Sequence, residues 1–436
     1  MVRITLQRYI SLVSNLAAFN FLQMNNKIKT ALQEKEFEAL KGRQRVILKW
    51  ATGCGKSKMA IDLINYAIGG ITHKPVSILF LVAERAHIEN WKQEFQKWNL
   101  QKEGIEVTIL CYASMKKVEY LSYDIVVMDE CHHVFTEKRL TSLWNLSKNL
   151  SSDSYIFLLS ATLPYAKQEE IESIFGKFIV STVTLKEAIK KDILPDPKIY
   201  VIGMELDDSI ANQEVTGYEG VNPKIVSWEE RNKYRYKRIP YKIRCTQEQK
   251  YLWYSIEMEY WKQRFDMSHN TFHHNKWVNL GSQRKRFLGE QKTKVVRQLI
   301  DKLPESERFV CFCTSVAQAE KLSVKDTISS KKSSKKNQKI IDSFNAKEIQ
   351  QLYAIGMITE GVNLTDIHLG IIVQLDGKER LFIQKFGRSL RAEDPVTFIF
   401  YYKNTQDEKY LKRALENVDE KYVRHINAEQ LKDLKL

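Results

Sequence analysis

A lysine and a serine directly follow two closely spaced glycines in the run RVILKWATGCGKS. An apolar stretch leads into the glycines and a helical pattern follows the serine, which is the setting of a phosphate-binding loop. Gly53 and Gly55 let backbone N–H groups converge on phosphate oxygens. Lys56 can reach the outer phosphates, and the Ser57 hydroxyl can bind Mg²⁺. The first glycine of the usual GxxxxGK[ST] pattern is replaced by Trp50, but the remainder predicts a phosphate-binding loop.

Two adjacent carboxylates, Asp129 and Glu130, end the apolar run IVVM. The carboxyl end of a strand is where α/β sheets bind ligands, so Asp129 can hold Mg²⁺ there. Glu130 can then polarise the attacking water. The alternative is an acidic strand end that is followed by two surface histidines. The position of the pair, two βα units after the phosphate loop, favours the catalytic interpretation.

Two further runs complete the candidate chemistry. Ser160-Ala-Thr162 ends the next apolar stretch, and QKFGRSLR places Arg388 and Arg391 three residues apart. On a helix, residues at i and i+3 share a face, so both guanidinium groups could reach one phosphate; a basic surface turn is the alternative. Arginines that come from a separate domain would make hydrolysis depend on closure of the two domains.

The elements that must position these residues follow a βα rhythm, which predicts mostly parallel sheets. Buried parallel strands read as continuous apolar runs. The predicted strands are Val46–Lys49, Ile78–Ala83, Val107–Cys111, Tyr123–Met128, Tyr155–Leu159, Lys198–Met204, Phe309–Thr314, Leu352–Met357, Leu369–Leu375 and Val396–Tyr401. The predicted helices include Lys58–Ala67, Arg85–Trp98, Thr141–Asn149, Val316–Leu322, Arg380–Phe386 and Asp407–Asn417. The Lys/Ser-rich stretch 321–339 is predicted to be a mobile basic loop.

Charge points to a polyanionic partner. The 436 residues carry a formal net charge of +15, and the window 226–300 alone holds 17 Lys+Arg against 7 Asp+Glu. Cations interleaved with aromatic residues are typical of a nucleic-acid groove, although a solvated helix face is the alternative. The residues expected to contact nucleic acid are Arg231, Lys233, Arg235, Arg284, Lys285 and Arg286, with Arg85 and Tyr112 on the first domain.

The remaining composition narrows the class of protein. Six cysteines without a CxxC pair argue against a structural zinc site and a disulfide framework, which predicts a reducing, cytoplasmic location. No apolar run is long enough to span a membrane. The first 33 residues lack Asp and Glu, as organellar transit peptides do, but an amphipathic helix is the preferred interpretation. The spacing of His269, His273 and His274 favours polar loop residues over a metal site.

Together, the runs ATGCGKS, DECHH, SATL, ITEGVNL and QKFGRSLR resemble motifs I, II, III, V and VI of the superfamily 2 DExH-type helicases and translocases. The spellings DECHH and EGVN are similar to those of phage repair helicases and restriction-type DNA translocases. No glutamine motif for adenine is evident before the phosphate loop, so ATP as the nucleotide follows from the resemblance alone.

The resemblance implies two RecA-like domains with ATP and Mg²⁺ in the cleft between them. The catalytic residues would be Lys56, Asp129, Glu130, Gln384, Arg388 and Arg391. The nucleotide would be contacted by Thr52, Gly53, Cys54, Gly55, Lys56, Ser57, Gly361 and Asn363. Ser57 and Asp129 would hold Mg²⁺, and Ser160, Thr162 and His132 would couple the nucleotide state to motion.

The expected fold class is α/β, with two RecA-like parallel-sheet domains in tandem and a mainly helical basic bridging segment. The predicted division is a helical extension (1–43), RecA-like domain 1 (44–197), the bridging segment (198–300), RecA-like domain 2 (301–425) and a tail (426–436). The expected function is an ATP-dependent helicase or translocase, monomeric or transiently assembled, with DNA favoured over RNA. The alternative is an ATP-gated nucleic-acid clamp or complex subunit that does not unwind.

Overall fold

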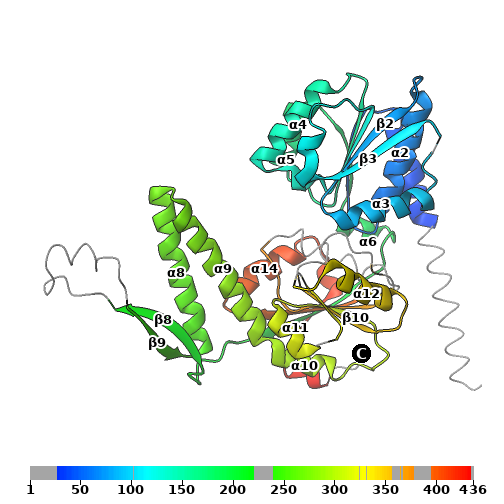
Figure 1. The fold of residues 1–436 in the computed structure, drawn as a ribbon. Coiled ribbons are helices and arrows are strands. Elements are labelled where there is room, and N and C mark those ends of the chain that lie inside the picture. The colour runs from blue at the N-terminus through cyan, green and yellow to red at the C-terminus, as the bar shows by residue number, and fades with distance from the viewer. Residues whose placement is uncertain are drawn as a thin grey trace, which may run out of the picture.

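The computed structural model describes residues 27–101, 103–219, 239–323, 325–329, 331–355, 364, 367–377 and 394–433. Its first sheet has six strands in the order β3-β2-β4-β5-β1-β6, and every neighbouring pair is parallel. Figure 1 labels β2 and β3 of this sheet. The strands are β1 (Arg45–Trp50), β2 (Val76–Val82), β3 (Ile105–Cys111), β4 (Ile125–Asp129), β5 (Tyr155–Ser160) and β6 (Ile179–Val183). Ile47, Phe80 and Val127 are fully buried, as expected for strands that are covered on both faces.

The helices of this unit follow its strands along the chain. They are α2 (Lys56–Gly70), α3 (Arg85–Lys97), α4 (Glu137–Asn149), α5 (Tyr165–Phe175) and α6 (Leu185–Lys190), with the 3₁₀ turns η1 (Tyr112–Lys117) and η2 (Cys131–Val134). Residues 27–40 form a further helical stretch before β1. This alternation places the start of each helix, or of a 3₁₀ turn, at the carboxyl edge of the sheet, where the candidate residues occur.

The second sheet has seven parallel strands in the order β11-β12-β10-β13-β14-β7-β15. They are β7 (Lys198–Met204), β10 (Phe309–Phe312), β11 (Thr327–Ile328), β12 (Gln351–Ala354), β13 (Leu369–Ile372), β14 (Val396–Tyr402) and β15 (Val423–Asn427). Its helices and turns are α10 (Thr293–Ile300), α11 (Val316–Leu322), α12 (Ser334–Asn345), α14 (Gln406–Leu415), η3 (Glu420–Tyr422) and η4 (Gln430–Lys432). The predicted α/β fold class with two parallel-sheet domains is confirmed.

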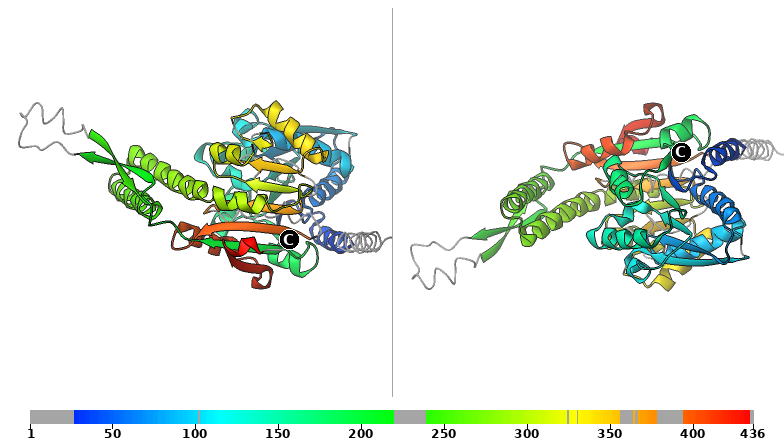
Figure 2. Two further views of the ribbon diagram at one scale, coloured as in Figure 1. Left: turned by 90° about the horizontal axis from the view of Figure 1, so that it is seen from below. Right: turned by 90° about the horizontal axis from the view of Figure 1, so that it is seen from above.

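Between β7 and β10 the chain leaves the second sheet. It forms the antiparallel pair β8 (Gln213–Glu219) and β9 (Ile239–Cys245), and then the helices α8 (Gln247–Ser268) and α9 (Thr271–Gln291). A capping box between Thr246 and Gln249 starts α8, and the Asn270 side chain caps α9. None of the residues of α8 is fully buried, and both views of Figure 2 show α8 and α9 as a helical hairpin that projects from the second domain.

The root of the α8–α9 hairpin is held by a buried lysine. Lys292, directly after α9, has no exposed surface, and its Nζ donates to Gln374 Oε1 (2.8 Å), to the Phe400 carbonyl (2.9 Å) and to Asp407 Oδ2 (2.7 Å). Burial lowers the pKa of Lys292, and the nearby Asp407 carboxylate opposes that shift. The hairpin is thereby fixed to strand β14 and helix α14 of the second sheet.

Two sequence predictions differ from the structure, and a third concerns residues that the structure does not describe. The loop predicted over 321–339 is wrong in part, because α11 ends at Leu322, β11 lies at 327–328 and α12 begins at Ser334. Lys335, Lys336 and Lys339 of α12 are exposed, whereas Ile341 and Phe344 are buried. Residues 198–204 were assigned to the bridging segment, but as β7 they lie inside the second sheet. Residues 426–427 were assigned to the tail, but they belong to β15 of the same sheet; the remaining boundaries stay predictions. The helix predicted at Arg380–Phe386 lies outside the described residues.

In the part of the chain that the structure describes, no helix has both the length and the apolar character needed to cross a membrane. All six cysteines are described, and each is a free thiol.

Candidate active site

The phosphate-binding loop connects the end of β1 to the start of α2. Gly53 and Gly55 both adopt left-handed backbone conformations, with φ of 94° and 92°. Residues other than glycine rarely adopt such φ angles, and a Cβ on Gly55 would also collide with the Gln33 amide. The two glycines therefore allow a tight turn in front of the α2 N-terminus, where N–H groups are available for anions.

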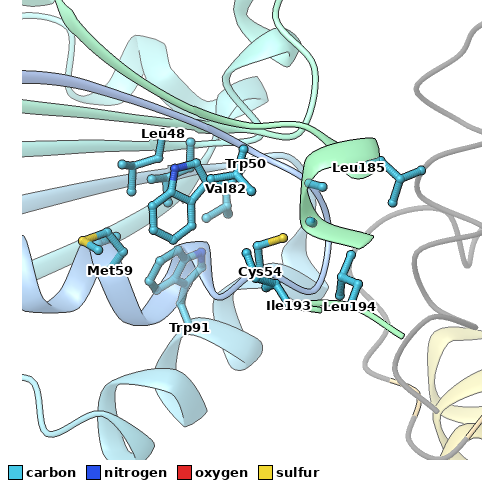
Figure 3. Packing of buried hydrophobic residues seen from close by; sticks show 14 of the residues in the cluster. Leu48, Trp50, Cys54, Met59, Val82, Trp91, Leu185, Ile193 and Leu194 are labelled. Atoms are coloured by element: carbon cyan, nitrogen blue, oxygen red, sulfur yellow. The ribbon is translucent and has the colours of Figure 1, made fainter. Parts of the chain in front are cut away.

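The side chains of this loop divide between its open side and the core. The Lys56 ammonium donates to the Trp50 carbonyl (2.8 Å), and Lys56, Ser57 and Thr52 are half-buried. Trp50 and Cys54 are buried in the core, and Figure 3 shows both among the residues packed beside the loop. Trp50 Nε1 donates to Ser181 Oγ (2.8 Å), so the bulky residue in place of the first glycine is accommodated in the interior.

The helical stretch before β1 also supports the loop. Lys29 Nζ donates to the Gly53 carbonyl (2.7 Å), and Gln33 Nε2 donates to the Cys54 carbonyl (3.3 Å). Gln33 is 4% exposed. From the sequence, these residues were predicted only to belong to a helical extension. Lys29 and Gln33 are four positions apart, so they share one face of a helix, and this spacing was the feature of the sequence that could have indicated a common role.

The acidic pair lies at the carboxyl end of β4. Asp129 is the last residue of the strand, and Glu130 follows with a left-handed φ of 46°. Asp129 Oδ1 accepts the Glu130 N–H (3.0 Å), and its Oδ2 accepts Trp91 Nε1 (2.9 Å). Because β4, β5 and β1 are consecutive in the sheet order and parallel, Asp129, Ser160 and the phosphate loop occupy the same edge of the sheet.

A chain of contacts joins the acidic pair to the Ser160-Ala-Thr162 run. His132 Nδ1 lies 3.3 Å from Glu130 Oε2 and 3.3 Å from Ser160 Oγ. Ser160 Oγ donates to the Thr162 carbonyl (2.8 Å). The structure thus brings together the three residues expected to couple the nucleotide state to motion, although the coupling role itself stays a prediction.

Tyr112 was expected to contact nucleic acid, and its position contradicts that expectation. The side chain is 1% exposed, and its hydroxyl donates to the Asp129 carbonyl (2.9 Å). Burial raises the pKa of Tyr112 well above its ordinary value, so the hydroxyl stays protonated. The ring stacks on His133, with ring centroids 6.3 Å apart. Tyr112 therefore supports the acidic pair from inside the domain, whereas Arg85 is exposed at the start of α3.

The three cations at 284–286 do not form one surface. Arg284 donates to Ser255 Oγ (2.9 Å) within the α8–α9 hairpin, and Lys285 forms an ion pair with Asp376. Only Arg286 is exposed. The other sequence-predicted residues lie outside the described part of the chain: Arg231, Lys233, Arg235, Gly361, Asn363, Gln384, Arg388 and Arg391.

This edge of the sheet fits a nucleoside triphosphate with Mg²⁺. It supplies two left-handed glycines, an ammonium, a hydroxyl and one strand-end carboxylate. Mg²⁺ in nucleotide sites keeps several waters and uses one or two protein carboxylates plus phosphate oxygens. The described residues contain no cluster of three or more His, Cys, Asp or Glu side chains that could hold a metal ion.

Fold and site define a motor ATPase built from two RecA-like sheets, and comparisons identify its family. Residues 19–165 match the family described as "Type III restriction enzyme, res subunit", and residues 291–393 match "Helicase conserved C-terminal domain". The DNA 3'-5' translocase XPB2 of Sulfurisphaera tokodaii is 21% identical over 425 residues, which cover 89% of this chain and 86% of that protein. The chain is a superfamily 2 helicase or translocase and an ATP hydrolase.

Solved structures support the same fold. S. cerevisiae Dbp5 bound to RNA and ADP BeF3 superposes with a TM-score of 0.58 at 11% sequence identity. The match covers 92% of this chain and 90% of that one. At this identity the likeness establishes the fold, which is two RecA-like domains in tandem.

Proposed function

We propose that this protein is a DNA-directed motor that hydrolyses ATP with Mg²⁺ and uses the energy to move along or remodel duplexes. The main support for this proposal is the shared edge of the first sheet. There the phosphate loop, Asp129 and Ser160 lie at the carboxyl ends of three neighbouring parallel strands. A phosphoryl-transfer site needs positioning and charge neutralisation rather than covalent chemistry, and these residue types supply both.

The positions of the residues at this edge suit them to hold the phosphates, the metal and the attacking water. The loop N–H groups and Lys56 would hold the outer phosphates, and Ser57 with Asp129 would hold the metal. Bound Mg²⁺ supplies charge neutralisation at the phosphate oxygens. Glu130, beside Asp129 and His132, would orient a water and accept its proton. Gln384, Arg388 and Arg391 would complete the site from the second domain when the domains close.

The preference for DNA rests on the relatives and on the motif spellings. The matching curated protein is named a DNA translocase, and the family matched by the first domain is that of a restriction-enzyme subunit. Exposed Arg85 and the basic residues of the bridging segment, including Arg286, Arg231, Lys233 and Arg235, would contact the backbone. We further propose a monomeric or transiently assembled protein of a reducing, cytoplasmic compartment, in keeping with its free thiols.

The test compares ATP turnover with and without single-stranded and duplex DNA and RNA. Strand displacement on tailed duplexes and removal of a triplex-forming strand are measured beside it. A DNA motor should gain at least about tenfold in turnover with DNA, because an arginine brought into place by closure can contribute on the order of 10³–10⁵ to turnover. Removal of the triplex strand without duplex unwinding would identify a translocase. An ATP turnover rate that does not change when DNA is added, or that rises with RNA alone, would refute the proposed substrate.

Two lysines of α2 provide a matched pair of variants. Lys56→Ala should reduce turnover by at least about a hundredfold, the scale of losing one preorganised electrostatic group. Lys58→Ala removes a cation two residues away that is paired with Asp62 (2.7 Å), and it should leave turnover within about twofold. Equal losses in both variants would contradict the specific role of Lys56.

A further inference from the structure

Trp91, on helix α3, contacts the candidate metal site, although it is not among the residues predicted from the sequence. Its side chain is 3% exposed, and its indole Nε1 donates to Asp129 Oδ2 over 2.9 Å. The ring packs against Phe80 and Phe95, with centroid distances of 5.0 and 5.8 Å. Figure 3 shows it beside Trp50, with Met59 on one side and Cys54 on the other. The ring is therefore enclosed and cannot turn away from Asp129 without disturbing the core.

The hydrogen bonds to Asp129 set the orientation of its carboxylate. One oxygen accepts the Glu130 N–H, and the other accepts the Trp91 N–H. Each carboxylate oxygen can accept two hydrogen bonds or metal contacts, so each retains a lone pair. Donors of this kind, one step removed from a metal, orient the ligands that do touch it, and their loss typically costs 10–100-fold in metal affinity.

We propose that Trp91 is a positioning residue for ATP hydrolysis, whose indole N–H holds the Asp129 carboxylate in the orientation that receives Mg²⁺. This rests on the proposed function, in which Asp129 is a metal ligand. Helix α3 begins at exposed Arg85, a proposed nucleic-acid contact, and carries Trp91 on its buried face.

A buried indole normally finds some hydrogen-bond partner, so the contact alone could serve packing. The chain offers a matched control for that alternative. Trp98, which caps the same helix, donates its Nε1 to Glu94 Oε2 (2.7 Å). Trp98→Phe therefore deletes an indole–carboxylate hydrogen bond at the end of the same helix, away from Asp129.

The experiment measures binding of a fluorescent, non-hydrolysable ATP analogue to the full chain, once with saturating Mg²⁺ and once with EDTA. The ratio of the two affinities is the Mg²⁺-dependent gain. In Trp91→Phe, the affinity for the analogue in EDTA should stay within about twofold of the wild-type value. The Mg²⁺-dependent gain should fall about tenfold, which is the scale expected when a hydrogen-bond donor to a metal ligand is lost. Trp98→Phe should match the wild type in both conditions. The Mg²⁺ concentration for half-maximal ATP turnover should rise in parallel only for Trp91→Phe.

The outcomes separate the two hypotheses. An unchanged gain in Trp91→Phe, or an equal loss of affinity with Mg²⁺ and with EDTA, would overturn the positioning role. Asp129→Ala tests the site assignment, because a full Mg²⁺-dependent gain in that variant would remove Asp129 from the metal site altogether. If Trp91→Phe fails to fold, Trp91→3-benzothienylalanine keeps the ring shape without the N–H. That variant should show the same tenfold loss, and a normal gain in it would overturn the proposal.

Discussion

Replacing buried Lys292 with methionine should strongly destabilise the second domain. All three N–H donors of the ammonium are used, by Gln374 Oε1, the Phe400 carbonyl and Asp407 Oδ2, and neither ionised side chain of the pair has exposed surface. Methionine approximates the length of lysine but carries no charge. Asp407 would then remain buried with hydrogen bonds from Gln374 and the Tyr402 N–H only. Removing one partner of a buried ion pair costs about 3–5 kcal/mol, because the other charge is left uncompensated.

Hydrogen exchange of the full chain, read by mass spectrometry on peptides from β14 and α14, measures this effect locally. Amides that exchange through opening of the second domain should exchange more than about a hundredfold faster in Lys292→Met, since each 1.4 kcal/mol is tenfold. Lys294→Met changes an exposed lysine two residues away and should leave these rates within about threefold. Peptides from the first sheet serve as an internal reference in both variants.

The double variant Lys292→Met with Asp407→Asn isolates the charge. It removes the stranded carboxylate, so it should recover at least about 1 kcal/mol relative to Lys292→Met alone. Exchange in Lys292→Met that matches Lys294→Met would refute the reasoning that this pair holds the root of the hairpin. A double variant less stable than the single one would show that the hydrogen bonds of Asp407, rather than its charge, set the cost.

Three further outcomes are expected. Glu130→Gln should bind ATP normally and fail to hydrolyse it, which single-turnover kinetics beside equilibrium nucleotide binding would reveal; loss of binding would contradict its role. Arg286→Ala should flatten the slope of log K against log salt for duplex DNA by about 0.9, whereas Arg284→Ala and Lys285→Ala should change it little, because those two side chains are engaged within the protein. Burial raises the pKa of the Cys54 thiol to about 11, so its thiolate is scarce at pH 8 and increases as the pH rises towards 11. Mass-spectrometric mapping of iodoacetamide labelling at pH 8 should therefore find Cys111, the one partly exposed cysteine, modified before Cys54.

Most of the fold could be predicted from the sequence because parallel strands covered on both faces appear as continuous apolar runs. The phosphate loop and the acidic pair could be predicted for a related reason: each directly follows such a run. The position of Tyr112 could not, since nothing local distinguishes a ring that contacts a ligand from one that fills the space beside η2. The cations at 284–286 were grouped because they are consecutive, yet neighbours on a helix point about 100° apart. Lys29, Gln33 and Trp91 join the site through contacts between distant segments, which a single sequence does not display.

The way the α8–α9 hairpin is attached has a mechanical consequence. The segment that contains the hairpin is connected to the second sheet at both ends: it starts after β7 and returns through α10 to β10. The buried ion pair of Lys292 fixes the base of the hairpin. We therefore expect the hairpin to move with the second domain as one rigid body. Helix α9 has 21 residues, which at 1.5 Å per residue makes an arm of about 32 Å. A tilt of only about 6° at the base displaces the tip by about 3.4 Å, the rise of one base pair, so small angular changes between the domains become distances of one nucleotide step.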